Sequence, residues 1–469
     1  MTSNLLLLSF FSVFPPLFSI FLALCTRRII PSLLAGILLG SGIYAYLEHV
    51  NFFEYSVSVF LLVLLNADHI CIFLFSLLMG SFVCLIQRSG GVEGFLNFVL
   101  KRNIINTGRG AGFFAFATGT LLFLEGSLSI LTVGTVARPL FRKYKIANEK
   151  LAYICDASCA PIAVLLPLNG WGAYLILQFS AQNIEEPVKL LLASLPFFIY
   201  PMIAIVLCLL SIGYQWDIGF MHQCQEEAER ECDAYVEAKQ SPGESENQKA
   251  GRFWMPVCVL IFVAFLSMWV TGQGNIVAGN GSLSVLAAVM TAIIFSYVLY
   301  LTEHVFTIKA LFKATYDGMR DLSGIVLILL LAFLLNAVCK DLQTGQTLAG
   351  IINGEFPVFL LPMMIFILSA FMAFATGTSW GTFAIMLAMA LPMAIELKLY
   401  LPLIVGAIVS GGVWGDHCSP VSDTTVLSAL AGGSEVIRHV QSQLPYAFIG
   451  ALLSAVIFLI LGLFILRIA

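Results

Sequence analysis

Charged residues are scarce in this chain of 469 residues. Asp, Glu, Lys and Arg make up 11% of it and hydrophobic residues 59%, whereas charged residues make up about 25% of an average soluble domain. The net charge of −4 gives no large basic surface that would attract nucleic acid. We therefore expect an all-α polytopic membrane protein whose main partner is the lipid bilayer, with no nucleic-acid partner.

Metal-binding patterns are lacking as well. The six His are not at ligand spacing, and the eleven Cys are scattered, mostly within apolar runs. This argues against a zinc site and favours cysteines that act as small core residues without disulfides. We expect no cofactor, and no metal beyond a transported cation.

We also expect no cleavable signal peptide. The first apolar run, Leu5–Leu24, lacks a positive segment before it and a small-residue cleavage site, and Arg27 and Arg28 follow it. These features indicate a retained membrane span.

Long apolar runs are what the chain has in abundance. A helix needs about 20 apolar residues to cross the hydrocarbon, and about ten runs qualify. In the first half they are Leu5–Leu24, Ile29–Leu47, Ile70–Gln87, Leu151–Ser180 and Val188–Tyr214; in the second they are Phe253–Thr271, Leu283–Leu301, Leu322–Val338, Tyr400–Ala431 and Pro445–Leu466. Two interrupted segments, Ala111–Val136 and Phe356–Leu397, are predicted to be re-entrant hairpins.

The two halves repeat one another. The sequence Ala-Thr-Gly-Thr at 117–120 recurs at 375–378, and the Asp-to-Pro run at 156–161 is echoed at 416–420, at nearly the same separation. Each half also has the same order of spans, hairpin and broken span. Internal repeats of this kind are common in secondary transporters.

Charge predicts the orientation of the repeats. If both hairpins return to the side that they left, the basic loops share one face, which then holds all but four of the 23 Lys and Arg. The positive-inside rule makes that face cytoplasmic. Five crossings per half invert the second half, so we predict two inverted-topology repeats with broken helices, at 1–214 and 253–469, joined by an acidic cytoplasmic linker at 215–252.

The run Gly415–Thr425 is the most informative stretch. It places Asp416 and Asp423 between apolar segments, where a charge costs on the order of 2.5–3.5 kcal/mol on insertion scales. Pro420 breaks the helix and frees backbone carbonyls, and broken backbone at this depth is tolerated where it is buried or lines a wet cavity. These features are typical of a small-ion or solute site.

Hydroxyl groups around the two carboxylates complete a candidate cation site. Hard cations prefer oxygen ligands, which Ser419, Ser422 and Thr424 would supply. The alternative is that Ser422 or Asp423 caps the helix that follows. For Asp423 both interpretations stay open, whereas capping does not explain Asp416.

Further candidates come from the first repeat and the hairpin tips. Asp156 is the symmetry partner of Asp416, and small residues near the hairpin tips would converge on both, unless they serve only close helix packing. His417 is expected to tune Asp416 through a hydrogen bond, and Glu125 is a buried carboxylate that alternatively pairs with a base. The predicted ion-binding set is Asp416, Asp423, Ser419, Ser422, Thr424, Asp156, Ser158, Thr118, Thr376 and Thr378.

The same stretch resembles a known family. Gly415–Thr425, followed by Gln441–Tyr446, resembles the signature of the NhaC-type sodium/proton antiporters, and Leu131–Leu140, Lys150–Tyr153 and Trp171–Tyr174 resemble the same family. Where members commonly carry paired acids before the Leu-Thr-Val-Gly run, this chain has one, Glu125. The resemblance implies a sodium/proton antiporter of the cell membrane, in bacteria the inner membrane, as a monomer or a homodimer.

The mechanism that we expect is competition. A carboxylate in a low-dielectric cavity holds either a proton or a sodium ion, so that the entry of one is tied to the exit of the other. The main alternative is a sodium- or proton-coupled exchanger of a small organic anion, such as a dicarboxylate or monocarboxylate, although no Arg lies within a span to pair with one.

An enzyme is the remote alternative. An intramembrane aspartyl protease would use two Asp residues on different spans, such as Asp156 and Asp416. Both, however, lie beside Pro-broken, hydroxyl-rich turns within an apparent inverted repeat, which is typical of transporters. We therefore expect a transporter and no enzymatic activity.

Overall fold

The computed structural model describes residues 2–91, 94, 106–122, 126–166, 169–182, 184–231, 249–275, 279–355 and 357–465. Within these ranges the chain forms helices and no strand. Nine of the described helices are long and apolar enough to cross a membrane, or up to eleven if each of two bent pairs is one span. The prediction of an all-α polytopic membrane protein is confirmed.

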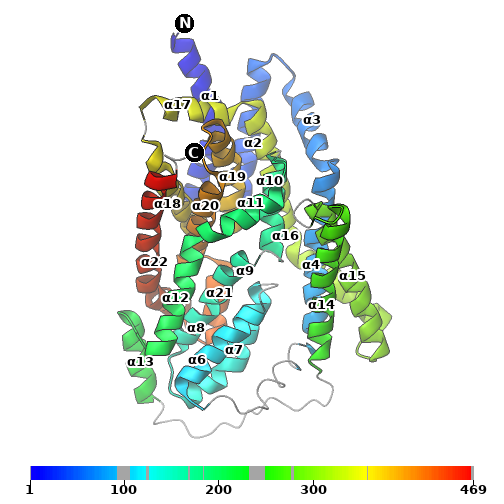
Figure 1. Ribbon diagram of the computed structural model, residues 1–469, viewed down its shortest axis with the longest axis vertical. Helices are drawn as coiled ribbons and strands as arrows, with labels where there is room; N and C mark the ends of the chain where they lie inside the picture. Colours follow the sequence, from blue (N-terminus) through cyan, green and yellow to red (C-terminus); the bar gives the residue numbers. More distant parts are fainter. Residues whose placement is uncertain are drawn as a thin grey trace.

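The first half packs short and broken helices around longer ones (Figure 1). Its elements are α1 (Thr2–Thr26), α2 (Ile29–Leu47), α3 (Phe52–Leu64), α4 (Ala67–Arg88), α6 (Gly108–Leu121), α7 (Gly126–Lys143), α8 (Asn148–Ala157), α9 (Ala160–Leu165), α10 (Gly170–Ala181), α11 (Pro187–Ser194), η1 (Leu195–Phe197) and α12 (Ile199–Tyr214).

The second half follows after α13 (Phe220–Glu231), which lies in the predicted linker. Its elements are α14 (Gly251–Thr271), α15 (Gly281–Thr302), α16 (Ile308–Asp341), α17 (Thr344–Glu355), η4 (Val358–Leu360), α18 (Leu361–Thr376), α19 (Ser379–Glu396), α20 (Leu401–Cys418), α21 (Asp423–Gly432) and α22 (Val436–Ile465).

The two halves are inverted with respect to each other. The α6–α7 hairpin starts at the lower end of the molecule in Figure 1 and the α18–α19 hairpin at the upper end, and α6 and α18 both run towards the middle. The broken spans that follow, α8–α9–α10 and α20–α21, run in opposite directions. This is the arrangement predicted from the charge distribution.

Backbone geometry supports the repeat independently. Residues other than Gly rarely adopt positive φ, yet they do so at matching connections in both halves. The matching pairs are Arg27 (φ 56°) with Gln273 (φ 51°), His49 (φ 55°) with His304 (φ 55°), and Lys145 (φ 54°) with Lys398 (φ 52°). They follow the first helix, the second helix and the hairpin of each half, so the two halves share these turns in detail.

Several predicted bounds need correction. The apolar runs did not predict α3, which is shorter than a full span. A span was predicted at 322–338, whereas α16 is one 34-residue helix whose charged first turns precede the apolar part. The last span was predicted to start at Pro445, whereas α22 begins at Val436 and runs through that proline. Both α16 and α22 extend beyond the apolar run because polar residues continue the helix.

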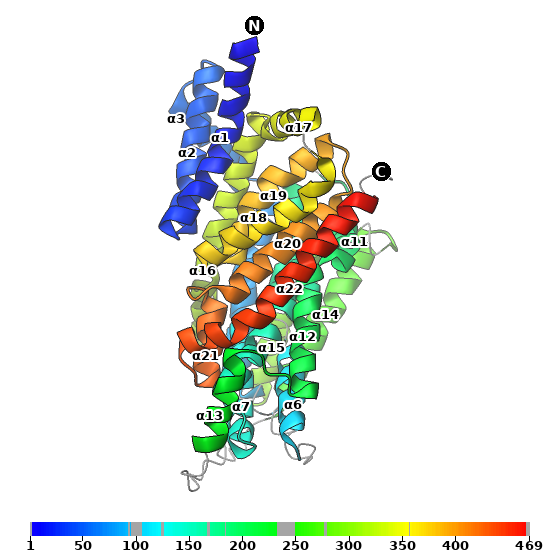
Figure 2. The ribbon, with the colours of Figure 1, turned by 90° about the vertical axis from the view of Figure 1, so that its left-hand side faces the viewer.

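The core of the protein surrounds α20. All residues from Pro402 to Cys418 of this helix are buried, and Figure 2 shows it side by side with α18 and α22. Gly411 and Gly415 face α18, where a Cβ on either would lie 2.3–2.4 Å from a backbone oxygen of that helix. Small residues four apart allow such close helix approach in membranes, so the end of α20 lies inside protein and away from lipid.

A second close crossing joins α4 and α16. A Cβ at Gly80 would lie 2.2 Å from the Gly318 carbonyl oxygen, and one at Gly318 would lie 2.3 Å from the Gly80 carbonyl oxygen. These two helices hold corresponding places in the two repeats. The contact therefore depends on the absence of a side chain at both positions.

We predict that Gly318→Ala destabilises the protein by about 1–3 kcal/mol, because the added methyl group meets backbone that can move only if the helices separate. Gly324→Ala is the matched control: it is on the same helix, a Cβ there meets nothing within 4 Å, and Ala favours helix over Gly. Thermal unfolding in detergent should show a lower midpoint for Gly318→Ala only. Equal midpoints would show that the crossing tolerates a side chain.

The inverted topology predicts opposite accessibility for the exposed side chains of Lys145 and Lys398. Each is replaced by Cys in a background lacking exposed Cys25 and Cys258, and also Cys232, which lies outside the described residues. An impermeant maleimide should label Lys398→Cys in intact cells and Lys145→Cys only after lysis. Equal labelling of both in intact cells would contradict the topology.

Candidate functional site

The site lies where α20 breaks. Asp416 is in the last turn of α20, Ser419 has an extended backbone (φ −78°, ψ 127°), and α21 begins at Asp423. The break is tied to the neighbouring hairpin because the Ser419 hydroxyl donates to the Phe374 carbonyl of α18 at 2.7 Å. Pro420 thus ends the helix as the sequence predicted, and the hairpin supplies the hydrogen-bond partner that the break requires.

Asp416 is buried and surrounded by hydroxyl groups. Ser422 donates to its Oδ1 at 2.7 Å, and Ser379 at the start of α19 donates to its Oδ2 at 3.0 Å. The Thr424 hydroxyl lies 2.9 Å from that of Ser422. Oxygen atoms from the break and from the α18–α19 hairpin therefore converge on one carboxylate.

Asp156 lies nearby in a different environment. Gln443 Nε2 donates to its Oδ2 at 2.9 Å, His439 Nε2 lies 3.5 Å away and His417 Nε2 3.9 Å away. The Thr425 hydroxyl links the Asp156 carboxylate to the backbone of Asp416, lying 3.5 Å from Asp156 Oδ2 and 3.2 Å from the Asp416 carbonyl oxygen. Asp156 is thus surrounded mainly by nitrogen donors, whereas the Asp416 carboxylate is held by hydroxyls.

His417 faces Asp156 and not Asp416. Its Nδ1 forms a 2.7 Å hydrogen bond with the Tyr200 hydroxyl of α12, and its Nε2 is turned towards Asp156. Its backbone carbonyl accepts a hydrogen bond from Gln443. The expectation of a direct hydrogen bond from His417 to the Asp416 side chain was therefore wrong, because the helical turn points the two adjacent side chains in different directions.

The threonine hydroxyls near the hairpin tips form hydrogen bonds within their own helices. Thr118 donates to the Phe114 carbonyl and Thr376 to the Met372 carbonyl, each at 2.8 Å within its own helix. Within the described residues neither bonds to Asp416 or Asp156. Ser158 is fully buried and donates to the Cys155 carbonyl at 3.3 Å. These residues shape the neighbourhood of the site without reaching either carboxylate.

The remaining predicted residues differ in their exposure. Asp423 is exposed, and its Oδ1 accepts the Thr424 backbone N–H at 3.0 Å. Ser422 occupies the cap position of α21 but makes no capping bond, because its hydroxyl is turned to Asp416. Thr378 precedes α19 without a side-chain cap bond. Glu125 lies outside the described residues.

Several partners in the site are outside the predicted ion-binding set. Gln443 and His439 are four apart on α22, which puts both on one helix face, and two polar residues on one face of an apolar span could have signalled them. Ser379 belongs to the hairpin tip that was expected to converge on the site, and Tyr200 looks like an ordinary aromatic residue of a span. Arg138 is a further partner: its guanidinium donates to the carbonyls of Leu430 and Ala431 at the end of α21.

A large cavity opens beside Asp416. It measures about 700 Å³ and is lined by residues of α4 and α16, of α19, α20 and α21, and of the starts of α7, α9 and α10, together with Ile30 of α2. Asp416, Asp423, Thr424 and Thr378 line it. Three of the predicted residues at the break, Asp416, Asp423 and Thr424, thus face a space large enough for a solute.

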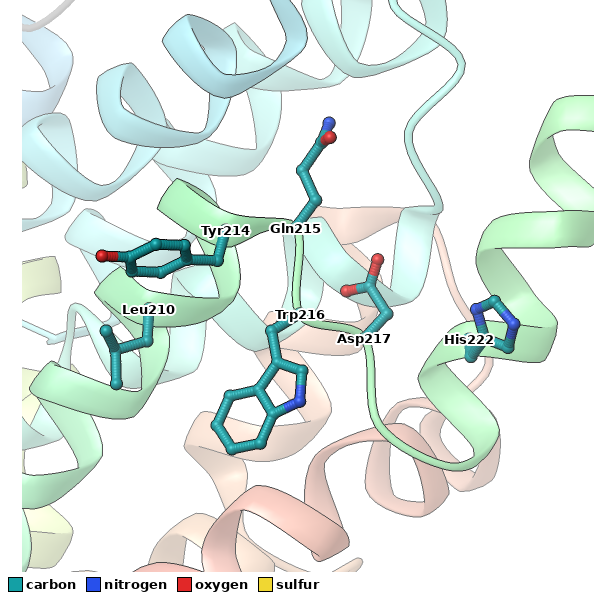
Figure 3. Close-up of a pocket in the computed structure, with 6 residues that line it drawn as sticks. All are labelled: Leu210, Tyr214, Gln215, Trp216, Asp217 and His222. Atoms are coloured by element: carbon teal, nitrogen blue, oxygen red, sulfur yellow. The ribbon is translucent and has the colours of Figure 1, made fainter.

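A second pocket is separate from this site. It measures about 440 Å³ and lies where α12 turns into α13 (Figure 3), lined by Leu210, Tyr214, Gln215, Trp216, Asp217 and His222. Asp217 already bonds to Lys150 at 2.8 Å, and the Trp216 carbonyl accepts the Tyr446 hydroxyl at 2.8 Å. Its polar groups hold helix ends together, so we do not place the site there.

Known proteins resemble this chain in both sequence and fold. An uncharacterised protein of Haemophilus influenzae is 32% identical, over 97% of this chain and 91% of its own. The malate-2H(+)/Na(+)-lactate antiporter of Bacillus subtilis is 36% identical over 105 residues, 22% of each chain. The crystal structure of the YdaH transporter of Alcanivorax borkumensis has a similar fold, with a TM-score of 0.56 and 16% identity over 87% of each chain.

The family model for the Na+/H+ antiporter family matches residues 171–463, which is more than half of the chain and includes the whole break between α20 and α21. The helices, the inverted repeat and the buried carboxylates agree with that match. The chain belongs to the Na+/H+ antiporter family and is a multi-pass secondary transporter of the cell membrane, not an enzyme.

Proposed function

We propose that this transporter exchanges sodium ions for protons and that Asp416 is the carboxylate that binds either one. The observation that carries the proposal is the pair of serine hydroxyls, from Ser379 and Ser422, that donate to the two oxygens of the Asp416 carboxylate. A serine hydroxyl is both donor and acceptor. Ser379 and Ser422 can donate to the empty carboxylate and rotate to present lone pairs once a cation binds.

The oxygen set suits sodium. The Asp416 carboxylate and the hydroxyls of Ser422, Ser379 and Thr424 offer oxygens alone, as hard cations prefer. Within the described residues no Lys or Arg forms an ion pair with Asp416. Its charge is therefore balanced by whatever enters from the cavity, a proton or a cation, and the two exclude each other.

Asp156 differs in this respect and serves as a positioning residue in the proposal. Gln443, His439 and His417 lie around it, so protein groups can balance its charge. Through Thr425 it is linked to the carbonyl of Asp416. This contact holds the two broken helices in register while the cation exchanges.

We predict that Asp416→Asn folds and inserts but moves no protons in response to sodium, because Asn keeps the size of the side chain and cannot titrate. The assay uses purified protein in vesicles with a pH-sensitive dye and sodium, lithium or potassium added in turn. Asp423→Asn should be milder, costing about 1 kcal/mol of local helix stability or less if that residue is mainly a cap. Normal sodium-driven proton movement by Asp416→Asn would move the exchange role to Asp156 or Asp423.

We also predict that Ser379→Ala raises the half-saturating sodium concentration about five- to tenfold, the effect expected when one oxygen ligand worth about 1 kcal/mol is lost. Ser454→Ala is the control, because Ser454 is equally buried but donates to its own helix at Gly450. Both variants are assayed in the same vesicles. An unchanged sodium dependence in Ser379→Ala would remove the hairpin from the cation site.

Exchange that involves an organic anion is the second candidate function. The cavity of about 700 Å³ far exceeds the room that sodium needs and lies within the range of small-molecule sites, about 300–1,000 Å³, but the charged side chains in its described lining are acidic and do not favour an anion. The relative named as a malate/lactate antiporter matches a fifth of the chain. Malate and lactate added to the same vesicles test this candidate: proton movement that requires either anion would favour it.

A further inference from the structure

The cavity beside Asp416 has a chemical character of its own. Its volume of about 700 Å³ is not explained by sodium and proton binding, because the Asp416 carboxylate and its serine hydroxyls provide enough ligands for either ion. Its walls combine acidic side chains, indole rings and apolar helix surface. Each of these features constrains what the cavity binds.

All charged side chains in the described wall are acidic. Asp416 and Asp423 contribute from the break, and Asp321 contributes from α16. No Lys, Arg or His is among the described lining residues. Arg88, which follows lining residue Gln87, is bound to Asp317 at 2.8 Å and also interacts electrostatically with Asp321. A cleft lined by charges of one sign concentrates solutes of the opposite sign.

Two tryptophans supply an aromatic surface in the lining of the cavity. Trp171 and Trp380 have ring centroids 5.1 Å apart, one from each repeat. Tyr174 fixes Trp380, because its ring lies edge-on at 5.0 Å and its hydroxyl donates to the Trp380 carbonyl at 2.9 Å. Indole faces attract organic cations by cation–π interaction and also cover hydrocarbon. Phe75 and Met79 of α4 add apolar surface to the lining.

We infer that the cavity binds an organic cation, a small amine or guanidinium compound with a short hydrocarbon body. Its charged group pairs with Asp321 and Asp423, and its body packs against Trp171 and Trp380. An organic anion would lose hydration beside three carboxylates with no basic partner in the described wall, which like-charge repulsion disfavours. The inference rests on the proposed function only in taking this cavity as part of the transport path.

Binding is tested without any gradient. Purified protein in a maltoside detergent and sodium-free potassium phosphate is heated with agmatine, cadaverine, glutarate or malate, each at millimolar concentration. Agmatine or cadaverine should raise the unfolding midpoint by about 2–4 °C, as expected for a ligand well above its Kd, and glutarate and malate should not. No shift with either amine, or an equal shift with either dicarboxylate, would overturn the inference.

Two matched variants locate the binding. Asp321→Asn should weaken the apparent agmatine affinity about tenfold, a loss of about 1.4 kcal/mol. Asp341→Asn, at the far end of the same helix and bonded to Tyr55 at 2.7 Å, should leave it unchanged. Equal weakening by both would mean that the amine responds to overall charge and not to the cavity.

The outcomes separate this inference from the proposed exchange. Amine binding by protein that moves no protons with sodium would leave the organic-cation site standing and refute the sodium/proton proposal. Sodium-driven proton movement without amine binding would do the reverse. Vesicles loaded with agmatine then show whether the bound amine is also carried, because labelled agmatine should exchange across the membrane in the wild type and not in Asp321→Asn.

Discussion

The structure depends on supplying hydrogen-bond partners to a backbone whose helix is broken inside the membrane. Unpaired carbonyl and N–H groups cannot face lipid, so other elements must surround the end of α20. Ser419 bonds to α18, Thr425 returns from α21 to the Asp416 carbonyl, and Gln443 of α22 bonds to the His417 carbonyl. The hairpin, the half-helix and the last span are thus held together at one point.

The carbonyl groups at the end of the half-helix α21 accept hydrogen bonds from side chains of the other repeat. Arg138 on α7 donates to the last carbonyls of α21, and Asn148 on α8 donates to the Gly433 carbonyl at 3.1 Å. A cation at the C-terminus of a helix is favourable for the helix dipole. The run Leu131–Leu140, whose purpose is not evident from its sequence, therefore supports the half-helix that carries Asp423 and Thr424.

The two symmetry-related carboxylates have diverged. Asp156 and Asp416 follow the same pattern in the sequence, yet one is surrounded by amide and imidazole nitrogens and the other by hydroxyls. The cavity reaches Asp416, whereas Asp156 is not among its described lining residues. One carboxylate therefore faces the cavity, and its counterpart is enclosed by protein.

The sequence predicted the fold well because its signals are local. Apolar runs, Pro420 and the distribution of basic loops define spans, break and inversion without knowledge of contacts. Partners such as Gln443 and Tyr200 were not predicted, since they meet Asp156 and His417 only after helices far apart in the chain pack together. Thr118 and Thr376 follow a local rule instead: a threonine within a helix commonly donates its hydroxyl to the carbonyl four residues earlier, so it is not free to reach a carboxylate.

The matching left-handed turns have a consequence for membrane insertion. The same turn geometry must work in both orientations, so geometry cannot tell the translocation machinery which way a half should enter. Two of the three matching turns carry the same residue type in both halves, His49 with His304 and Lys145 with Lys398, whereas Arg27 corresponds to Gln273, which removes a positive charge on the side that must cross. The orientation signal therefore lies in the distribution of basic residues over all the loops, which gathers most of the Lys and Arg on one face.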